Sequence, residues 1–117
     1  MQRYLSKLLS ETLELFKNEK AIVNINSENA MIVGDLHGNF EALEFLLNFR
    51  TKTECKDMIF LGDYVDKGEE SVDVLSRLLE LKLEEPENIT LLRGNHETIE
   101  VNRSHGFYEE IQDEELF

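Results

Sequence analysis

The sequence predicts an α/β fold, a β-α-β-α-β layer with a mainly parallel sheet flanked by helices, preceded by an N-terminal amphipathic helix. Short apolar runs alternate with stretches of helical spacing. The runs are nearly continuous, which is typical of parallel strands covered by helices. In addition, each of the three runs "MIV", "MIFL" and "ITLL" is followed by a cluster of glycine and polar residues. Right-handed crossovers are expected between such strands.

The N-terminal part of the chain predicts one helix and two strands. Residues 4–17 repeat apolar side chains at helical spacing, so an amphipathic helix that needs a partner surface is expected there. Its apolar side chains are Leu5, Leu8, Leu9, Leu13 and Phe16. "AIVNI" at 21–25 and "AMIVGD" at 30–35 are then predicted to be short strands, the second almost wholly apolar.

Two further pairs of helix and strand are predicted after them. "NFEALEFLLNF" (39–49) and "EESVDVLSRLLELK" (69–82) have the length and apolar spacing of helices. "DMIFLGD" (57–63) and "ITLLRGN" (89–95) are short apolar runs that predict buried strands. We assign residues 1–117 to one domain, because this length suits a single compact unit and no internal repeat divides it.

Composition and charge limit the classes of function. Hydrophobic residues make up 41% and charged residues 32%, as expected of a soluble globular protein. The 12 basic and 25 acidic residues give a formal net charge of −13. This charge argues against nucleic acid as a partner, because phosphate backbones need a basic surface. An acidic protein can still act on phosphates where a metal ion or a local arginine inverts the field.

The sequence predicts neither a membrane span nor a secretory signal. A span needs a run of about eighteen apolar residues, and the N-terminus has no apolar region followed by a small-residue cleavage site. Cys55 is the single cysteine, so no disulfide framework and no cysteine metal site are expected. A reducing cytoplasm is therefore the expected location.

The polar clusters that follow the three strands form the candidate functional region. They are "GDLHG", "GDYVDKG" and "RGNHE". Because ligands of open α/β sheets bind at the carboxyl ends of the strands, the three clusters are expected to converge on one edge.

The types of residue in these clusters predict a divalent-metal site. Asp35 and His37 are two residues apart, so both point to the same side of an extended strand end. Asp63 and Asn95 end the next two strands, and the two oxygens of Asp63 could bridge two ions. Oxygen-rich sets with one or two imidazoles suit manganese, iron or zinc. Two such ions polarise a phosphoryl group and activate a water molecule that attacks in line.

The remaining polar residues suggest acid catalysis and phosphate binding. His96 is adjacent to Asn95, so it is better placed as a general acid than as a ligand of the same ion. Asp66 is the carboxylate expected to orient its imidazole. Arg93 and Lys67 are cations near this edge that could contact substrate phosphate or pair with surface acids. Glu97 is predicted to be structural and to bond nearby loop amides.

The three clusters together resemble the signature blocks of a known family. "GDLHGN" (34–39), "GDYVDKG" (62–68) and "RGNHE" (93–97) are similar to those of the phosphoprotein phosphatases, the metal-dependent serine/threonine phosphatases of the calcineurin-like metallophosphoesterase superfamily. "HETIEVNRSHGFYEEI" (96–111) resembles the run that follows the third block in eukaryotic-type members. The resemblance covers roughly residues 1–112.

The resemblance implies hydrolysis of phosphoserine and phosphothreonine monoesters by direct attack of a metal-bridging water or hydroxide. It assigns Asp35, His37 and Asp63 to a first metal ion, and Asp63 with Asn95 to a second. Manganese is expected first, with iron or zinc as alternatives. The other matching positions are His96 as general acid paired with Asp66, and Arg93 and Lys67 near the phosphate. The expected partner is a phosphoprotein substrate.

Three departures from the family pattern affect these expectations. The family has arginine at Lys67, and lysine cannot grip phosphate bidentately. It usually has tyrosine at His105, which we interpret as a packing position. Family members also continue beyond the position of Phe117 with further ligands and a second sheet that completes a β-sandwich. The resemblance thus implies an incomplete domain whose uncovered sheet face is available to a complementing chain or to self-association.

Two alternatives stay open. The chain could be a small-molecule phosphoesterase of the dinucleoside polyphosphate hydrolase type, although the segment after "RGNHE" argues against it. It could also be a catalytically inactive half-domain that binds a metal ion or a partner chain.

Overall fold

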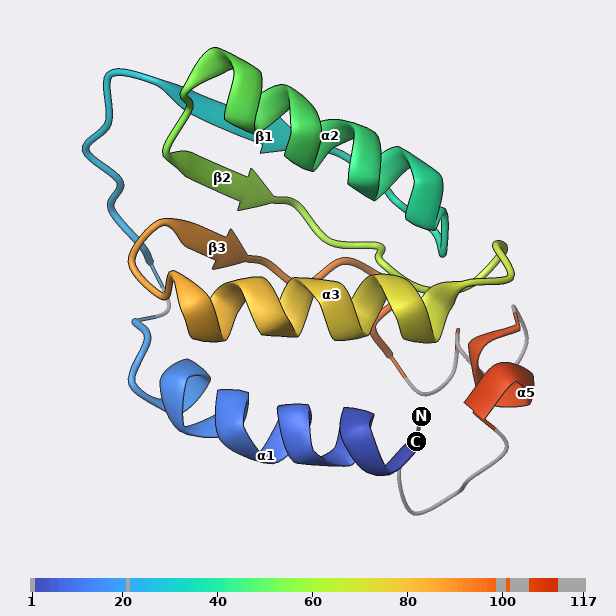
Figure 1. Cartoon of the computed structure of the whole chain (residues 1–117). Helices are drawn as coiled ribbons and strands as arrows, with labels where there is room; N and C mark the ends of the chain where they lie inside the picture. Colours follow the sequence, from blue (N-terminus) through green and yellow to red (C-terminus); the bar gives the residue numbers. More distant parts are fainter. Residues whose placement is uncertain (1, 21, 99–100, 102–105, 112–117) are drawn as a thin grey trace.

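The computed structural model describes residues 2–20, 22–98, 101 and 106–111 (Figure 1). Its helices and strands follow in the order α1 (Gln2–Lys17), β1 (Ala30–Val33), α2 (Phe40–Thr53), β2 (Asp57–Phe60), α3 (Ser71–Glu84), β3 (Ile89–Leu91) and α5 (Phe107–Ile111). None of the described helices is long and apolar enough to cross a membrane.

The three strands form one parallel sheet in the order β1-β2-β3. Met58 of β2 is paired with Met31 of β1 and with Ile89 of β3, so the three strands run side by side and their carboxyl ends lie at one edge. This arrangement confirms the predicted β-α-β-α-β layer and the N-terminal helix before it.

The strand predicted at 21–25 is wrong for the residues that the structure describes. Residues 22–25 are not in a strand, and Ile22 is 77% exposed. The apolar, β-branched composition favours a strand, but a strand also needs a neighbour to pair its backbone groups. The described sheet has β1 at one edge and β3 at the other, and neither pairs with this segment.

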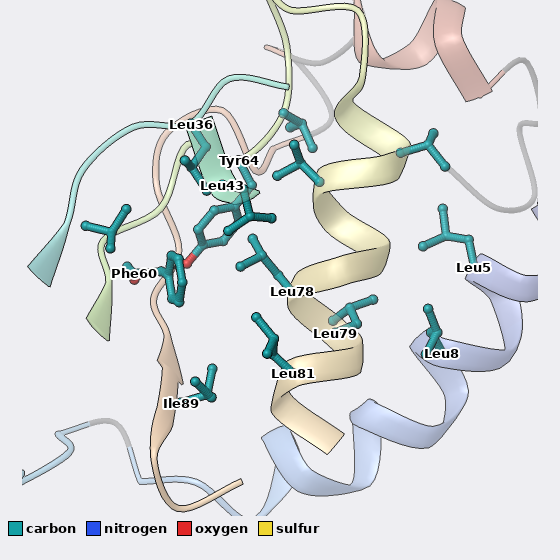
Figure 2. Close-up of a cluster of buried hydrophobic side chains, with 14 of the residues drawn as sticks. Leu5, Leu8, Leu36, Leu43, Phe60, Tyr64, Leu78, Leu79, Leu81 and Ile89 are labelled. Atoms are coloured by element: carbon teal, nitrogen blue, oxygen red, sulfur yellow. Dashed lines mark hydrogen bonds between the residues drawn. The ribbon is translucent and has the colours of Figure 1, made fainter. Parts of the chain in front are cut away.

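Helix α3 lies at the centre of the hydrophobic core (Figure 2). Leu78 faces the sheet, where Phe60 of β2 is fully buried. Leu79 lies on the side of α3 that Leu5 and Leu8 of α1 cover. Burial of each such side chain stabilises the fold by about 1.5–3 kcal/mol relative to exposure.

The partner surface expected for the N-terminal helix is α3, but only part of the predicted apolar stripe reaches it. Leu5 and Leu8 are buried, whereas Leu9 and Leu13 are exposed. Thr12 occupies the third buried position and donates its hydroxyl to Leu8 O at 2.8 Å. The single helix neighbour covers mainly the positions i, i+3 and i+7, so Leu9 and Leu13 stay in solvent, whereas Phe16 is half-buried and packs against the core.

Much of one face of the sheet is uncovered in the part of the chain that the structure describes. Met58 and Phe60 point to the helices and are fully buried. On the opposite alternation, Ile32 is 68% exposed, and Leu61 and Leu92, directly after β2 and β3, are 47% and 42% exposed, whereas Thr90 of β3 is buried. Such a contiguous apolar face is typical of a surface that has a partner.

An ion pair joins the end of α2 to the end of α3. The Arg50 guanidinium donates to Glu85 through Nη1 (2.9 Å) and Nη2 (3.0 Å), and its Nε donates to Cys55 O at 2.9 Å. The hydrogen bonds from Arg50 are the main reason why the pKa of Glu85 lies below its ordinary value. The pair therefore fastens the α2–β2 connection to the C-cap of α3.

We expect Glu85→Gln to lower the free energy of unfolding at pH 7 by less than about 1 kcal/mol, because the carboxylate is partly exposed to solvent. A carboxyl group with a lowered pKa in the folded state stabilises the fold above its unfolded pKa. This contribution is lost as the pH falls through the folded pKa. Urea unfolding should thus show the difference at pH 7 and lose it in acid. Glu84→Gln, at an exposed neighbouring position, is the control and should show no comparable difference.

Candidate metal centre

The predicted metal ligands follow the carboxyl ends of the strands and lie together. Asp35 follows β1, Asp63 follows β2 and Asn95 follows β3. One ligand atom each of Asp35, His37 and Asp63 lies within 4.8 Å of the other two. Two carboxylates and one imidazole at this separation are a donor set that fits a divalent cation such as manganese, iron or zinc.

The His37 ring is oriented by a backbone carbonyl. Its Nδ1 lies 2.9 Å from Val65 O, which can only accept a hydrogen bond, so Nδ1 carries the proton. Nε2 is then the atom with the free lone pair, and it lies 3.5 Å from Asp35 Oδ2. A ligand histidine held in this way by its second nitrogen is a common feature of metal sites.

Asp63 connects the second and third strand ends. Its Oδ1 accepts the backbone N–H of His96 at 2.9 Å. One atom of the Asn95 side-chain amide lies 3.0 Å from both carboxylate oxygens of Asp63, where a nitrogen would donate to them and an oxygen would share a cation with them. The structure therefore brings Asn95 to Asp63, next to the group formed with Asp35 and His37.

Glycines allow the strand ends to approach closely. A Cβ on Gly62 would overlap the backbone nitrogen of Gly94 and lie 2.6 Å from its Cα. Gly62 also has φ +115, a backbone conformation that side chains rarely allow. The turn after β1 is held to the turn after β2, because the N–H groups of Leu36 and His37 both donate to Asp63 O. Close backbone contacts thus set the spacing of the ligands.

The loop between β2 and α3 contains several residues in left-handed conformations. Asp63, Asp66 and Lys67 have φ values of 58°, 69° and 71°. Such residues cluster at functional sites and persist only where their surroundings hold them. Here Glu97 supplies part of that restraint, since its two carboxylate oxygens accept the N–H groups of Asp63 (3.1 Å) and Tyr64 (2.8 Å).

The structure thus confirms that Glu97 bonds loop amides. Burial is the main cause that raises the pKa of Glu97 above its ordinary value, and the two amide hydrogen bonds oppose this rise.

His96 and Asp66 form a buried pair beside the candidate ligands. The His96 Nδ1 lies 3.0 Å from Asp66 Oδ2, and Asp66 is fully buried. The His96 ring meets the His37 ring edge to face, with centroids 4.5 Å apart. This contact places the imidazole of the pair next to the ligand group.

Arg93 and Lys67 are exposed at the same edge of the sheet. Arg93 Nε donates to Glu97 O at 2.9 Å, so its stem is anchored on the loop that carries Asn95. Pairing with surface acids was the alternative to phosphate binding for these two cations. Among the described residues, neither Arg93 nor Lys67 forms such an ion pair. His105 lies outside the described residues.

The sequence reasoning missed the residues that support the buried pair. Asp66 N donates to Ser71 Oγ at 3.1 Å, and Asp66 Oδ1 accepts the N–H of Phe107 at 2.8 Å. Glu110 accepts the N–H groups of Ser71 and Val72. Except for the local bond between Asp66 and Ser71, these contacts join residues 38 to 41 positions apart, so patterns over a few residues could not reveal them.

Comparisons with known proteins support a relation over most of the chain. The family described as calcineurin-like phosphoesterase matches residues 29–117. The chain is 44% identical over 111 residues to the uncharacterized protein F44B9.9 of Caenorhabditis elegans, covering 86% of this chain and 43% of that protein. It is 38% identical over 106 residues to the serine/threonine-protein phosphatase 6 catalytic subunit of Drosophila melanogaster, covering 91% and 35%.

A solved structure shows the same fold. The protein serine/threonine phosphatase of Saccharomyces cerevisiae, described as similar to human phosphatase PP5, superimposes with a TM-score of 0.81 at 30% identity. The match covers 96% of this chain and 38% of that one. The chain therefore spans less than half of the length of each of these relatives.

Proposed function

The chain belongs to the calcineurin-like phosphoesterase family and is homologous to catalytic subunits of protein serine/threonine phosphatases, and from this we propose that it acts as a metal-dependent protein serine/threonine phosphatase. The substrates would be phosphoserine and phosphothreonine monoesters of a phosphoprotein. The observation that carries the proposal is the meeting of Asp35, His37 and Asp63 with the buried pair of His96 and Asp66.

The family implies bound metal ions, and the donor set at the strand ends fits them. Asp35, His37 and Asp63 would hold one divalent ion, and Asp63 with Asn95 a second. Manganese is our first choice for both, with iron or zinc as alternatives. Bound there, the ions would supply Lewis-acid polarisation of the phosphoryl group and activation of the attacking water.

The chain's own residues would position the ester and move a proton. The Nδ1–H of His96 is held by Asp66, so in the doubly protonated ring the proton on Nε2 would be the one given to the leaving oxygen. Arg93 and Lys67 are exposed and would contact the phosphate oxygens. Lysine acts there as a point charge, so the grip of Lys67 is weaker than that of an arginine.

We expect His96→Asn to lower kcat on a phosphoserine peptide by about 10²- to 10⁴-fold, the range attributed to a positioned general acid. Asp66→Asn should also lower kcat, because an amide has only one oxygen to accept from both Phe107 N–H and His96 Nδ1–H. Manganese affinity, measured by calorimetry, should stay close to that of the unsubstituted chain in the His96 variant. An unchanged kcat in His96→Asn would contradict the assignment.

The proposed activity is tested by following phosphate release from a phosphothreonine peptide and from diadenosine tetraphosphate, each with manganese and with EDTA. Manganese-dependent release from the peptide in preference to the dinucleotide supports a protein phosphatase. The opposite preference would favour a small-molecule phosphoesterase. Binding of manganese without turnover of either substrate would favour an inactive half-domain.

We extend the proposal to the uncovered sheet face, which we assign to a complementing chain. The exposed side chains of Ile32, Leu61 and Leu92 provide an apolar surface there. A net charge of −13 opposes association with a second copy. Light scattering should therefore give a monomer mass for the chain alone, whereas a dimer that Ile32→Lys dissociates would indicate self-association.

We place the protein in the cytoplasm, in keeping with its single, free Cys55, and imaging of a tagged chain tests this.

A further inference from the structure

Helix α5 lies against the beginning of α3, next to the loop that carries Asp66 (Figure 1). It is a short helix, Phe107–Ile111, and the side chains of Phe107 and Ile111 are buried. The helix is therefore part of the packed structure at this end of the sheet.

Glu110 of α5 caps the first turn of α3. Its Oε1 accepts the N–H of Ser71 at 3.0 Å, and its Oε2 accepts the N–H of Val72 at 2.6 Å. The residue at the N-cap position, Glu70, makes no side-chain capping bond. Glu110 thus satisfies amides that a helix start leaves without partners inside the helix, and it does so from a distant position in the chain.

The capped residue is directly connected to the buried pair. Ser71 is fully buried, and its Oγ accepts the N–H of Asp66 at 3.1 Å. From the other side, the N–H of Phe107 donates to Asp66 Oδ1 at 2.8 Å. Asp66 Oδ2 then lies 3.0 Å from His96 Nδ1. Two routes of hydrogen bonds therefore lead from α5 to Asp66, one of them through Glu110.

The loop between Asp66 and Ser71 needs such restraint. Asp66 and Lys67 are both in the left-handed region, with φ values of 69° and 71°. Conformations of this kind are unfavourable for residues with a Cβ and persist only where contacts hold them. The cap on Ser71 fixes the far end of this loop.

We propose that Glu110 is a positioning residue, which holds the backbone of Asp66 through Ser71 and thereby keeps the Asp66 carboxylate and the His96 ring in the orientation for proton donation. This inference rests on the proposed function for its catalytic consequence. Its structural part is independent of turnover, because the hydrogen bonds predict the state of the His96 ring whether or not the chain is active.

The test compares Glu110→Gln and Glu110→Asp with Glu70→Gln. The Glu70 variant makes the same change of charge at the same end of α3 but removes no capping bond.

Long-range ¹H–¹⁵N correlation spectra of the histidine rings, assigned with His96→Asn, report which nitrogen carries the proton. Steady-state kinetics with manganese use a phosphoserine peptide, whose leaving group is poor, and para-nitrophenyl phosphate, whose leaving group needs little protonation. Circular dichroism at the assay temperature selects variants that are folded.

In Glu110→Gln, the Nδ1–H signal of His96 should lose the shift that its hydrogen bond to Asp66 produces, and kcat on the peptide should fall about tenfold, a part of the general-acid effect. Turnover of para-nitrophenyl phosphate should fall much less, and Glu110→Asp should restore part of the loss. Unchanged His96 signals in folded Glu110→Gln overturn the inference. So does an equal loss on both substrates, which indicates general damage to the site. If the unsubstituted chain turns over neither substrate but the His96 signals still move, the proposed function fails and the positioning role stands.

Discussion

Gly62→Ala is expected to lower the free energy of unfolding by about 3 kcal/mol or more, since overpacking costs about 1–3 kcal/mol and a left-handed φ about 1–2 kcal/mol. The added Cβ would meet the backbone of Gly94 and Arg93, which cannot move aside as a flexible side chain can. Because small domains are stable by only about 5–15 kcal/mol, this is a large fraction of the total.

The matched control is Gly34→Ala. Gly34 also stands directly before an aspartate ligand candidate at a strand end, but a Cβ there would meet no atom within 4 Å. Its substitution should change the free energy of unfolding by less than about 0.5 kcal/mol. Urea unfolding followed by circular dichroism measures both variants. Equal stability of the two would mean that the close approach of the strand ends has been described wrongly.

Asp63→Asn is expected to abolish manganese-dependent turnover and to weaken manganese binding by more than about 100-fold. Loss of a residue that only hydrogen-bonds to a metal ligand lowers metal affinity by up to about 100-fold, and loss of the ligand carboxylate itself should cost more. Asp63 joins the ligand candidates, since it is grouped with Asp35 and His37 and also contacts Asn95. Asparagine keeps an oxygen that can accept the N–H of His96, so the loop has no reason to rearrange.

Asp57→Asn is the control, with the same change of charge at the opposite end of β2. Calorimetric titration of both variants with manganese, together with phosphate release from the peptide, checks the prediction. Manganese affinity in Asp63→Asn equal to that of the Asp57 variant would contradict the metal site itself. This outcome does not depend on whether the chain is catalytically active.

The order of elements was predictable because it depends on local patterns. The continuous apolar runs of β1, β2 and β3 and the helical spacing of α2 and α3 are properties of neighbouring residues. The strand predicted at 21–25 was wrong, since composition alone cannot supply the neighbour with which a strand must pair. The sequence also did not reveal that Thr12 would be buried and Leu13 exposed, because the position of α3 decides which side of α1 is covered.

Candidate ligands could be named from the sequence for a related reason. A parallel sheet brings all its carboxyl ends to one edge, so Asp35, Asp63 and Asn95 had to come near one another once the strands were recognised. The contact of Asp66 with His96 was also expected, as was the bonding of Glu97 to loop amides.

What the sequence alone determined is therefore the α/β layer, the edge at which the polar clusters meet and the types of ligand present there. The tertiary structure decided the rest: the backbone contact between Gly62 and Gly94, the carbonyl of Val65 that orients His37, and the support of Asp66 by α5. Strand order and side-chain type follow from local spacing along the chain. Distances of a few ångströms between residues far apart in sequence exist only after the chain has packed.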